Sequence, residues 1–258
     1  MQFNIHTHSN FCDHALGNPR EYVEVAIENG YKTLGFSEHS PCIFPNGFRS
    51  HYRLMPEDKG MYIKTILALK DEYKNDIQIL VGLEMEYYPL YFADMLKDAK
   101  DMGVEYLLLG QHYTGSEYPD GFYAAVRHTD KNILSTYVNE TIEGLKTGVF
   151  TYLAHPDLCN FLGDDDFYKK EMKRLCLTAK ELNIPIELNL LGIRQNRHYP
   201  NPNFWDVAGQ VGNKVILGID AHAPEHLANK ESFKIAEELI RRYSLKTLEK
   251  TQIINIQK

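Results

Sequence analysis

The chain has 258 residues, and its 28 lysines and arginines against 35 aspartates and glutamates give a formal net charge of −7. This acidic balance argues against a protein that coats nucleic acid, because phosphate backbones bind to basic surfaces. A hydrophobic fraction of 43% with 12% aromatic residues excludes a disordered chain and predicts a folded globular one.

The sequence carries no membrane or secretion signal. No apolar run approaches the roughly 20 residues that cross a bilayer, and residues 1–4 show no basic segment before an apolar stretch. We therefore expect a cytoplasmic protein that does not contact membranes. The cysteines are widely spaced and form no CxxC pair, so we expect reduced thiols at Cys12, Cys42, Cys159 and Cys176.

Short apolar runs alternate with amphipathic segments along the chain. The apolar runs predict buried parallel strands at residues 3–5, 33–37, 77–83, 106–109, 150–154, 184–188 and 214–219. The segments between and after them predict helices at residues 20–29, 56–73, 90–102, 132–146, 167–182, 204–211 and 232–243. This alternation favours a closed (β/α) barrel over an open doubly wound sheet, with residues 1–258 as a single domain.

Side chains that can bind metals lie at or just after the ends of these predicted strands. In a barrel all these ends converge on one face, where such enzymes keep their active sites. Imidazole and carboxylate are the usual ligands of zinc, manganese and iron, and His-x-His points two imidazoles to one side of an extended segment. Without an ion, such a cluster would leave many buried polar atoms unpaired. The sequence therefore predicts a metal centre from His6, His8, His14, His39, Glu84, His112, His155, Asp220 and His222.

This ordered set of residues resembles the PHP (polymerase and histidinol phosphatase) family over residues 6–222. Phe-Cys-Asp-His-Ala at residues 11–15, Ser-Glu-His-Ser-Pro at 37–41 and Gly-Leu-Glu at 82–84 resemble its histidinol-phosphate phosphatase branch. The resemblance implies an α/β fold, a distorted (β/α)7 TIM-like barrel, and three divalent transition-metal ions (zinc, manganese or iron).

The resemblance also implies how the ligands divide among the ions. His6, His8, Glu84 and Asp220 would hold the first ion, Glu84 would bridge to a second held by His112 and His155, and the third would be held by His14, His39 and His222. Glu86 shares a strand face with Glu84 and is the alternative bridge. We prefer Glu84 because it directly follows the Gly-Leu end of its apolar run.

The charge of such a site favours a phosphate substrate. Three divalent ions, two carboxylates and a bridging hydroxide leave about +3, which a phosphomonoester dianion would reduce to about +1. Ions of this kind lower the pKa of water towards ~7, so a metal-bridging hydroxide could attack phosphorus directly.

Other residues are candidates for binding substrate or protonating the leaving group. Arg194 and Arg197 follow the sixth strand and could clamp phosphate oxygens, with Arg197 preferred, and His198 could line the pocket. Asp157 or Asp13 could protonate the leaving group or orient an imidazole.

The expected activity is that of a phosphomonoesterase acting on L-histidinol phosphate in histidine biosynthesis. Two alternatives stay open: a related phosphoesterase acting on nucleotides or oligonucleotide ends, and a non-catalytic metal-binding regulator. We reject an amidohydrolase, because that class typically has a lysine at the fourth strand, where this chain has Gln111-His112. The oligomeric state stays open.

Overall fold

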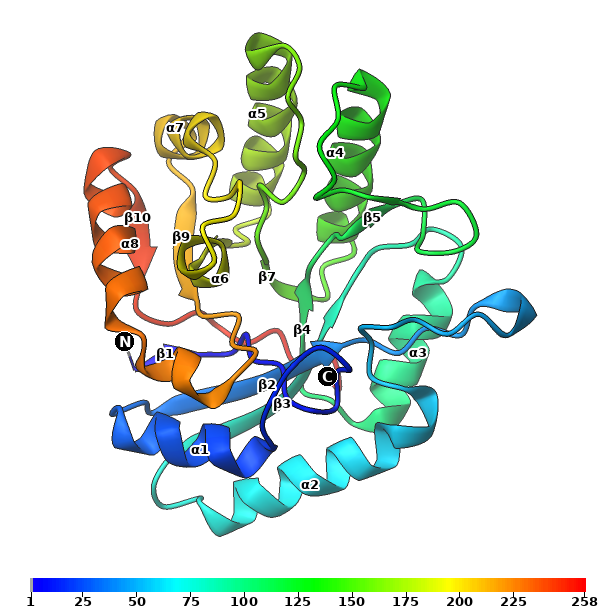
Figure 1. The fold of residues 1–258 in the computed structure, drawn as a ribbon, viewed down its shortest axis with the longest axis vertical. Coiled ribbons are helices and arrows are strands. Elements are labelled where there is room, and N and C mark those ends of the chain that lie inside the picture. The colour runs from blue at the N-terminus through cyan, green and yellow to red at the C-terminus, as the bar shows by residue number, and fades with distance from the viewer. Residues whose placement is uncertain (1) are drawn as a thin grey trace.

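The computed structural model describes residues 2–258, and within them an eight-stranded parallel sheet follows the chain order. Its strands are β1 (Phe3–Asn4), β2 (Thr33–His39), β3 (Gln78–Met85), β4 (Tyr106–Leu109), β7 (Phe150–Leu153), β8 (Ile186–Asn189), β9 (Lys214–Gly218) and β10 (Lys246–Leu248). The sheet curls on itself, and helices cover its outer face (Figure 1). The predicted α/β barrel is confirmed, and each predicted strand is present with its ends within two residues.

The helices are α1 (Pro19–Glu28), α2 (Lys59–Glu72), α3 (Phe92–Met102), α4 (Lys131–Lys146), α5 (Asp165–Glu181), α6 (Leu190–Arg194), α7 (Pro202–Val211) and α8 (Lys230–Arg242). Local sequence accounts for their ends. A capping box between Asn18 and Glu21 starts α1. Gly103 and Gly212, with left-handed backbone at φ 80° and 76°, end α3 and α7.

The barrel closes at the carboxyl ends of its strands. Just beyond β1 and β9, Thr7 and Ala221 form a parallel bridge, and the His8 amide donates to the Ala221 carbonyl at 2.8 Å. At the other end β10, which the sequence did not predict, pairs with β9. Among residues 2–258, β1 and β10 are the two edges of the sheet and do not pair with each other. The barrel is therefore open at the amino-terminal ends of its strands.

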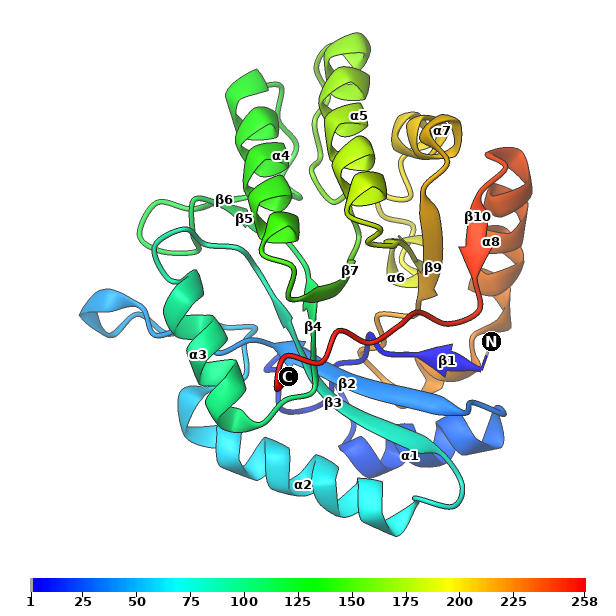
Figure 2. The same ribbon diagram turned by 180° about the vertical axis from the view of Figure 1, so that it is seen from behind.

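An apolar plug fills the amino-terminal end of the barrel. Tyr106 is fully buried there, and its hydroxyl donates to the carbonyl of Ile5 at 2.7 Å. The C-terminal segment crosses beneath the strands (Figure 2), where the amide of Ile256 donates to the Glu105 carbonyl. Polar chemistry is thereby left to the opposite, carboxyl end.

The long connection after β4 carries a hairpin that the sequence pattern does not predict. Strands β5 (Tyr113–Thr114) and β6 (Phe122–Tyr123) pair antiparallel, apart from the main sheet. The four cysteines are free thiols, as expected. Within residues 2–258, no helix has both the length and the hydrophobicity to cross a membrane.

Candidate metal centre and active site

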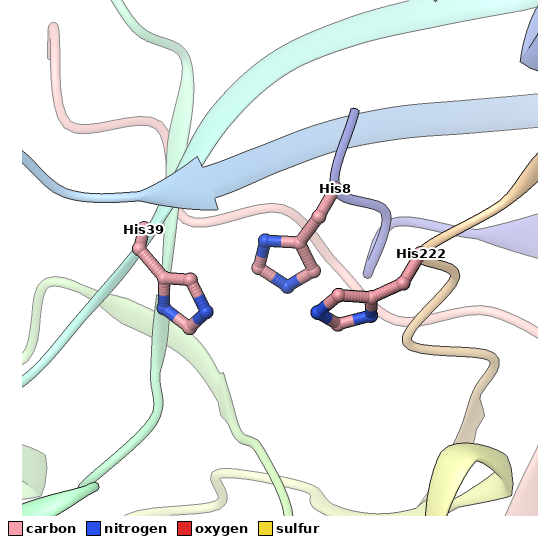
Figure 3. Close-up of side chains that lie close together, drawn as sticks. All are labelled: His8, His39 and His222. Carbon is pink, nitrogen blue, oxygen red and sulfur yellow. The ribbon is translucent and has the colours of Figure 1, made fainter. Parts of the chain in front are cut away.

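The nine predicted ligands come together at the carboxyl ends of the strands. Seven of them line a cavity of about 350 Å³: His14, His39, Glu84, His112, His155, Asp220 and His222. His6 and His8 have no exposed surface and lie beneath the others. Figure 3 shows rings from three separate elements, His8, His39 and His222, gathered around one space.

The deepest part of the cluster matches tetrahedral metal coordination. The Nε2 atoms of His6 and His8 lie 3.3–3.5 Å from Glu84 Oε2 and Asp220 Oδ1. A tetrahedral zinc ion with bonds of about 2.0–2.1 Å would separate neighbouring ligand atoms by about 3.3–3.4 Å. All four atoms are buried without a hydrogen-bond partner among residues 2–258. Buried nitrogen and oxygen atoms that converge in this way without partners fit a bound cation.

The two oxygens of Glu84 face two different groups of ligands. Oε2 faces His6 and His8 and lies 3.2 Å from His39 Nδ1. Oε1 lies 2.7 Å from His155 Nε2 and 3.7 Å from His112 Nε2. This is the geometry that a bridging carboxylate needs.

Glu86 lies behind His112, away from the cluster. One of its oxygens accepts from His112 Nδ1 at 3.0 Å and the other from Arg53 Nη1 at 2.8 Å. Its position favours Glu84 as the bridge.

The third predicted group lies at the rim. His14 Nε2 and His222 Nε2 are 2.9 Å apart, so one imidazole donates and the other accepts, or both face a shared cation. His39 stacks on His8 with ring centroids 4.4 Å apart and lies between the rim and the Glu84 groups. Its ring can therefore join either group.

Two residues of β8 support the ligands and were not assigned from the sequence. Glu187 accepts from His6 Nδ1 at 2.7 Å and from the His155 amide at 3.0 Å. Asn189 donates to Glu187 and, at 3.0 Å, to Asp220 Oδ2. Metal-binding histidines usually donate a hydrogen bond from their second ring nitrogen to such a carboxylate. The available signal was two polar residues, two positions apart, in an otherwise apolar strand.

Two glycines make room for the buried carboxylates. A Cβ on Gly110 would overlap Glu84 Oε1, and a Cβ on Gly218 would overlap Glu187 Oε1. Each glycine lies on or next to the strand beside its carboxylate, so any side chain there would displace the acid.

The backbone is strained at two of the ligands. His155 and Asp220 have φ of 27° and 49°, in the left-handed region that residues other than glycine seldom adopt. Such conformations cost about 1–3 kcal/mol and persist where the surrounding structure holds them, often at functional sites.

Burial and the charges of the cluster shift the pKa values of its imidazoles in opposite directions. Burial lowers the pKa of His8, but Asp220 and Glu84 outweigh it and raise that pKa to about 9. Burial and the charge of His8 lower the pKa of His14 to about 4. Burial raises the pKa of Glu84, yet the imidazoles around it, His39 first, hold it well below its usual range. The deep end is therefore a site for cations, and the rim imidazole is neutral at pH 7.

A family model described as the PHP domain matches residues 4–191. The chain belongs to the PHP domain family. A histidinol-phosphatase of Bacillus subtilis is 34% identical over 253 residues, covering 84% of this chain and 92% of the relative. A probable histidinol-phosphatase of Deinococcus radiodurans is 28% identical over 228 residues, covering 85% of each chain.

Solved structures share the fold of this PHP chain. One is histidinol phosphate phosphatase from Lactococcus lactis subsp. lactis, complexed with zinc, L-histidinol and phosphate. It is 18% identical, has a TM-score of 0.73 and covers 99% of this chain and 97% of that one. A putative histidinol phosphatase from Listeria monocytogenes is also 18% identical, with a TM-score of 0.71, covering 89% of this chain and 98% of that one.

Of the predicted substrate residues in this PHP chain, only Arg197 lines the cavity. Its Nε donates to Gln195 at 2.8 Å and its Nη1 to the Tyr199 hydroxyl at 2.9 Å, and both partners also line the cavity. Arg194 instead donates from Nη2 to the backbone carbonyl of Asp220 at 3.2 Å. His198 does not line the cavity, and its Nε2 lies 2.6 Å from the carbonyl oxygen of Leu158.

The two predicted acids, Asp157 and Asp13, lie outside the cavity lining. Asp157 is 1% exposed and accepts from the Asn201 amide at 2.7 Å and from Trp205 Nε1 at 2.9 Å. Burial raises its pKa to about 6, but it anchors the start of α7 instead of facing the cavity. Asp13 is exposed beside His14 and does not line the cavity. The roles predicted for these two carboxyl groups stay predictions.

Proposed function

We propose that this PHP protein is a metal-dependent phosphomonoesterase whose substrate is L-histidinol phosphate. One observation carries the proposal: the two oxygens of Glu84 face separate groups of ligand atoms at the floor of a cavity whose wall holds Arg197. A site of this kind combines ligands for metal ions with a guanidinium that can bind phosphate.

We propose that the site holds three divalent ions of zinc, manganese or iron. His6, His8, Glu84 and Asp220 would hold the first, Glu84, His112 and His155 the second, and His14, His39 and His222 the third. When bound, such ions lower the pKa of water and offset charge on phosphoryl oxygens. The buried atoms without hydrogen-bond partners support the first of these sites most directly.

Arg197 is the residue that we expect to bind the phosphate. Its contacts to Gln195 and Tyr199 fix the guanidinium at the cavity wall. A planar guanidinium binds two phosphate oxygens at once, which orients the phosphorus over the cluster.

The leaving group would lie against an aromatic wall. Tyr52, Tyr113 and Tyr123 line the cavity, and the rings of Tyr113 and Tyr123 are 5.3 Å apart. Their faces can stack on a planar imidazole and attract a nearby amine. The relatives named histidinol-phosphatase and the related structure that holds L-histidinol and phosphate support this substrate.

We further propose that residues 1–258 form one domain. The PHP match ends at residue 191, but the segment after β9 supplies Asp220 and His222. The C-terminal segment packs under β4 and β7. The site would be incomplete without this last quarter of the chain.

The proposal is tested by measuring phosphate release from L-histidinol phosphate with protein loaded with zinc or manganese. We expect turnover that chelation removes and that added metal restores. Tight metal binding without hydrolysis of any phosphomonoester would favour a metal-binding regulator. Full activity in protein that elemental analysis finds free of metal would contradict the proposal.

A further inference from the structure

A buried arginine joins three segments around the candidate centre without lining the cavity. Arg53 lies in the connection between β2 and α2 and is 1% exposed. Its guanidinium donates to Ser40 O at 2.9 Å, Glu86 Oε2 at 2.8 Å, Glu117 Oε2 at 2.8 Å, Tyr52 OH at 2.6 Å and Tyr88 OH at 3.1 Å. The acceptors lie just beyond β2, beside Arg53 itself, just beyond β3 and in the loop between β5 and β6.

Glu86 connects this arginine to His112. Oε2 of the carboxylate accepts from Arg53, and Oε1 accepts from His112 Nδ1 and from the Tyr52 hydroxyl, each at 3.0 Å. The opposite ring nitrogen, Nε2, then faces Glu84 across 3.7 Å. Arg53 therefore contacts a candidate ligand through one intervening side chain.

We propose that Arg53 is a positioning residue that determines which nitrogen of His112 is offered to the metal centre. It does so by holding the carboxylate of Glu86 against Nδ1. This inference rests on the proposed metal site and goes beyond the ligands themselves.

The chemistry of the three groups explains the effect. An ionised carboxylate only accepts hydrogen bonds, so His112 carries its proton on Nδ1 and leaves the Nε2 lone pair for an ion. Arg53 Nη1, 2.8 Å from Oε2, holds this carboxylate in the orientation that places Oε1 against His112 Nδ1. A lysine would keep the charge but could not reach all five acceptors, because only the guanidinium spans them.

Replacing Glu86 by glutamine gives a specific test. Arg53 still donates to the Oε2 position, so the amide oxygen must lie there and the amide nitrogen must face His112 Nδ1. His112 then has to accept at Nδ1 and carry its proton on Nε2, where it can no longer bind an ion. Adding Arg53→Met frees the amide to turn and restores the wild-type proton position.

The measurement is zinc affinity by competition with a chromogenic chelator, together with thermal melting of every variant. We expect Glu86→Gln to weaken one zinc site about 10- to 100-fold. Arg53→Met/Glu86→Gln should recover most of that loss. Glu117→Gln is the matched control, because it keeps an acceptor for Arg53 and does not touch His112; its zinc affinity should equal that of wild type.

Nitrogen-15 NMR of metal-free protein gives a second readout that does not need the double variant to fold. The proton of His112 should lie on Nδ1 in wild type and on Nε2 in Glu86→Gln. A proton on Nδ1 in both proteins would overturn the inference, as would a folded double variant whose zinc affinity stays as weak as that of Glu86→Gln. Wild-type protein that binds no zinc would instead overturn the proposed function.

Discussion

Oε1 of Glu187 lies 2.7 Å from Nδ1 of His6, and both side chains are completely buried. The carboxylate fixes the ring so that its other nitrogen, Nε2, points at Glu84 and Asp220. The ligand geometry at the floor of the cavity therefore depends on a residue that touches no candidate ion.

Glu187→Gln should weaken zinc binding about 10- to 100-fold, the usual cost of losing a carboxylate behind a metal-binding histidine. Both of its oxygens accept hydrogen bonds, so an amide nitrogen at either position faces a donor. Chelator competition measures the effect. Tyr152→Phe is the control, because it removes a hydroxyl that donates to the same carboxylate but leaves the contact to His6. Equal zinc affinity in Glu187→Gln and wild type would contradict this role.

Gly110→Ala should displace Glu84 and reduce metal retention, because the new Cβ would overlap Oε1. Overpacking of this kind costs about 1–3 kcal/mol, so we also expect a lower melting temperature. Gly60→Ala serves as the control, since nothing lies near a Cβ built there in α2. Metal content after desalting and thermal melting report the two effects. A Gly110→Ala protein with full metal content would show that Glu84 does not need this space.

Arg197→Ala should lower kcat/KM for the phosphomonoester by about ten- to a hundredfold, since a hydrogen bond to a charged group contributes roughly 1.5–3 kcal/mol. Its metal content should not change. Arg194→Ala should lower stability more than kcat/KM, because that guanidinium bonds backbone carbonyls. Steady-state kinetics with parallel metal analysis distinguish the two. Wild-type kcat/KM in Arg197→Ala would remove this residue from the phosphate site.

Metal affinity should rise with pH between 7 and 9. The raised pKa of His8, about 9, means that its ring holds a proton at pH 7, where a metal ion and the proton compete for the same nitrogen. Each displaced proton makes apparent affinity rise about tenfold per pH unit until the pH passes that pKa. Chelator competition at pH 7 and pH 8 tests this. No change between them would mean that the ring is already neutral at pH 7.

The clustering of the candidate ligands was predictable because most of them lie at or just after the end of a buried apolar run. In a parallel barrel, a position just beyond such a run lies on one face whatever the loops do, so His39, Glu84 and His155 could be placed without a structure. Seven of the eight strands of the main sheet followed from the same pattern. A three-residue edge strand such as β10 gives too little periodicity to detect.

Residues whose role depends on the path of a loop could not be placed. Arg194 and Arg197 lie three positions apart, and which of them faces the cavity depends on α6, a five-residue helix. Asp157 is held by Trp205, 48 positions away, a contact that no local pattern encodes. Arg53 lies in a connection without periodicity, so its contact with Glu86 also came only from the structure.

The most direct test of the account is one competition experiment on metal-loaded protein. L-histidinol phosphate, nucleoside monophosphates and sugar phosphates are mixed in equal amounts, and phosphorus-31 NMR follows the loss of each. We expect L-histidinol phosphate to disappear first, with kcat/KM at least about tenfold above that of any competitor. Faster hydrolysis of a nucleotide, or equal rates for all three classes, would contradict the account.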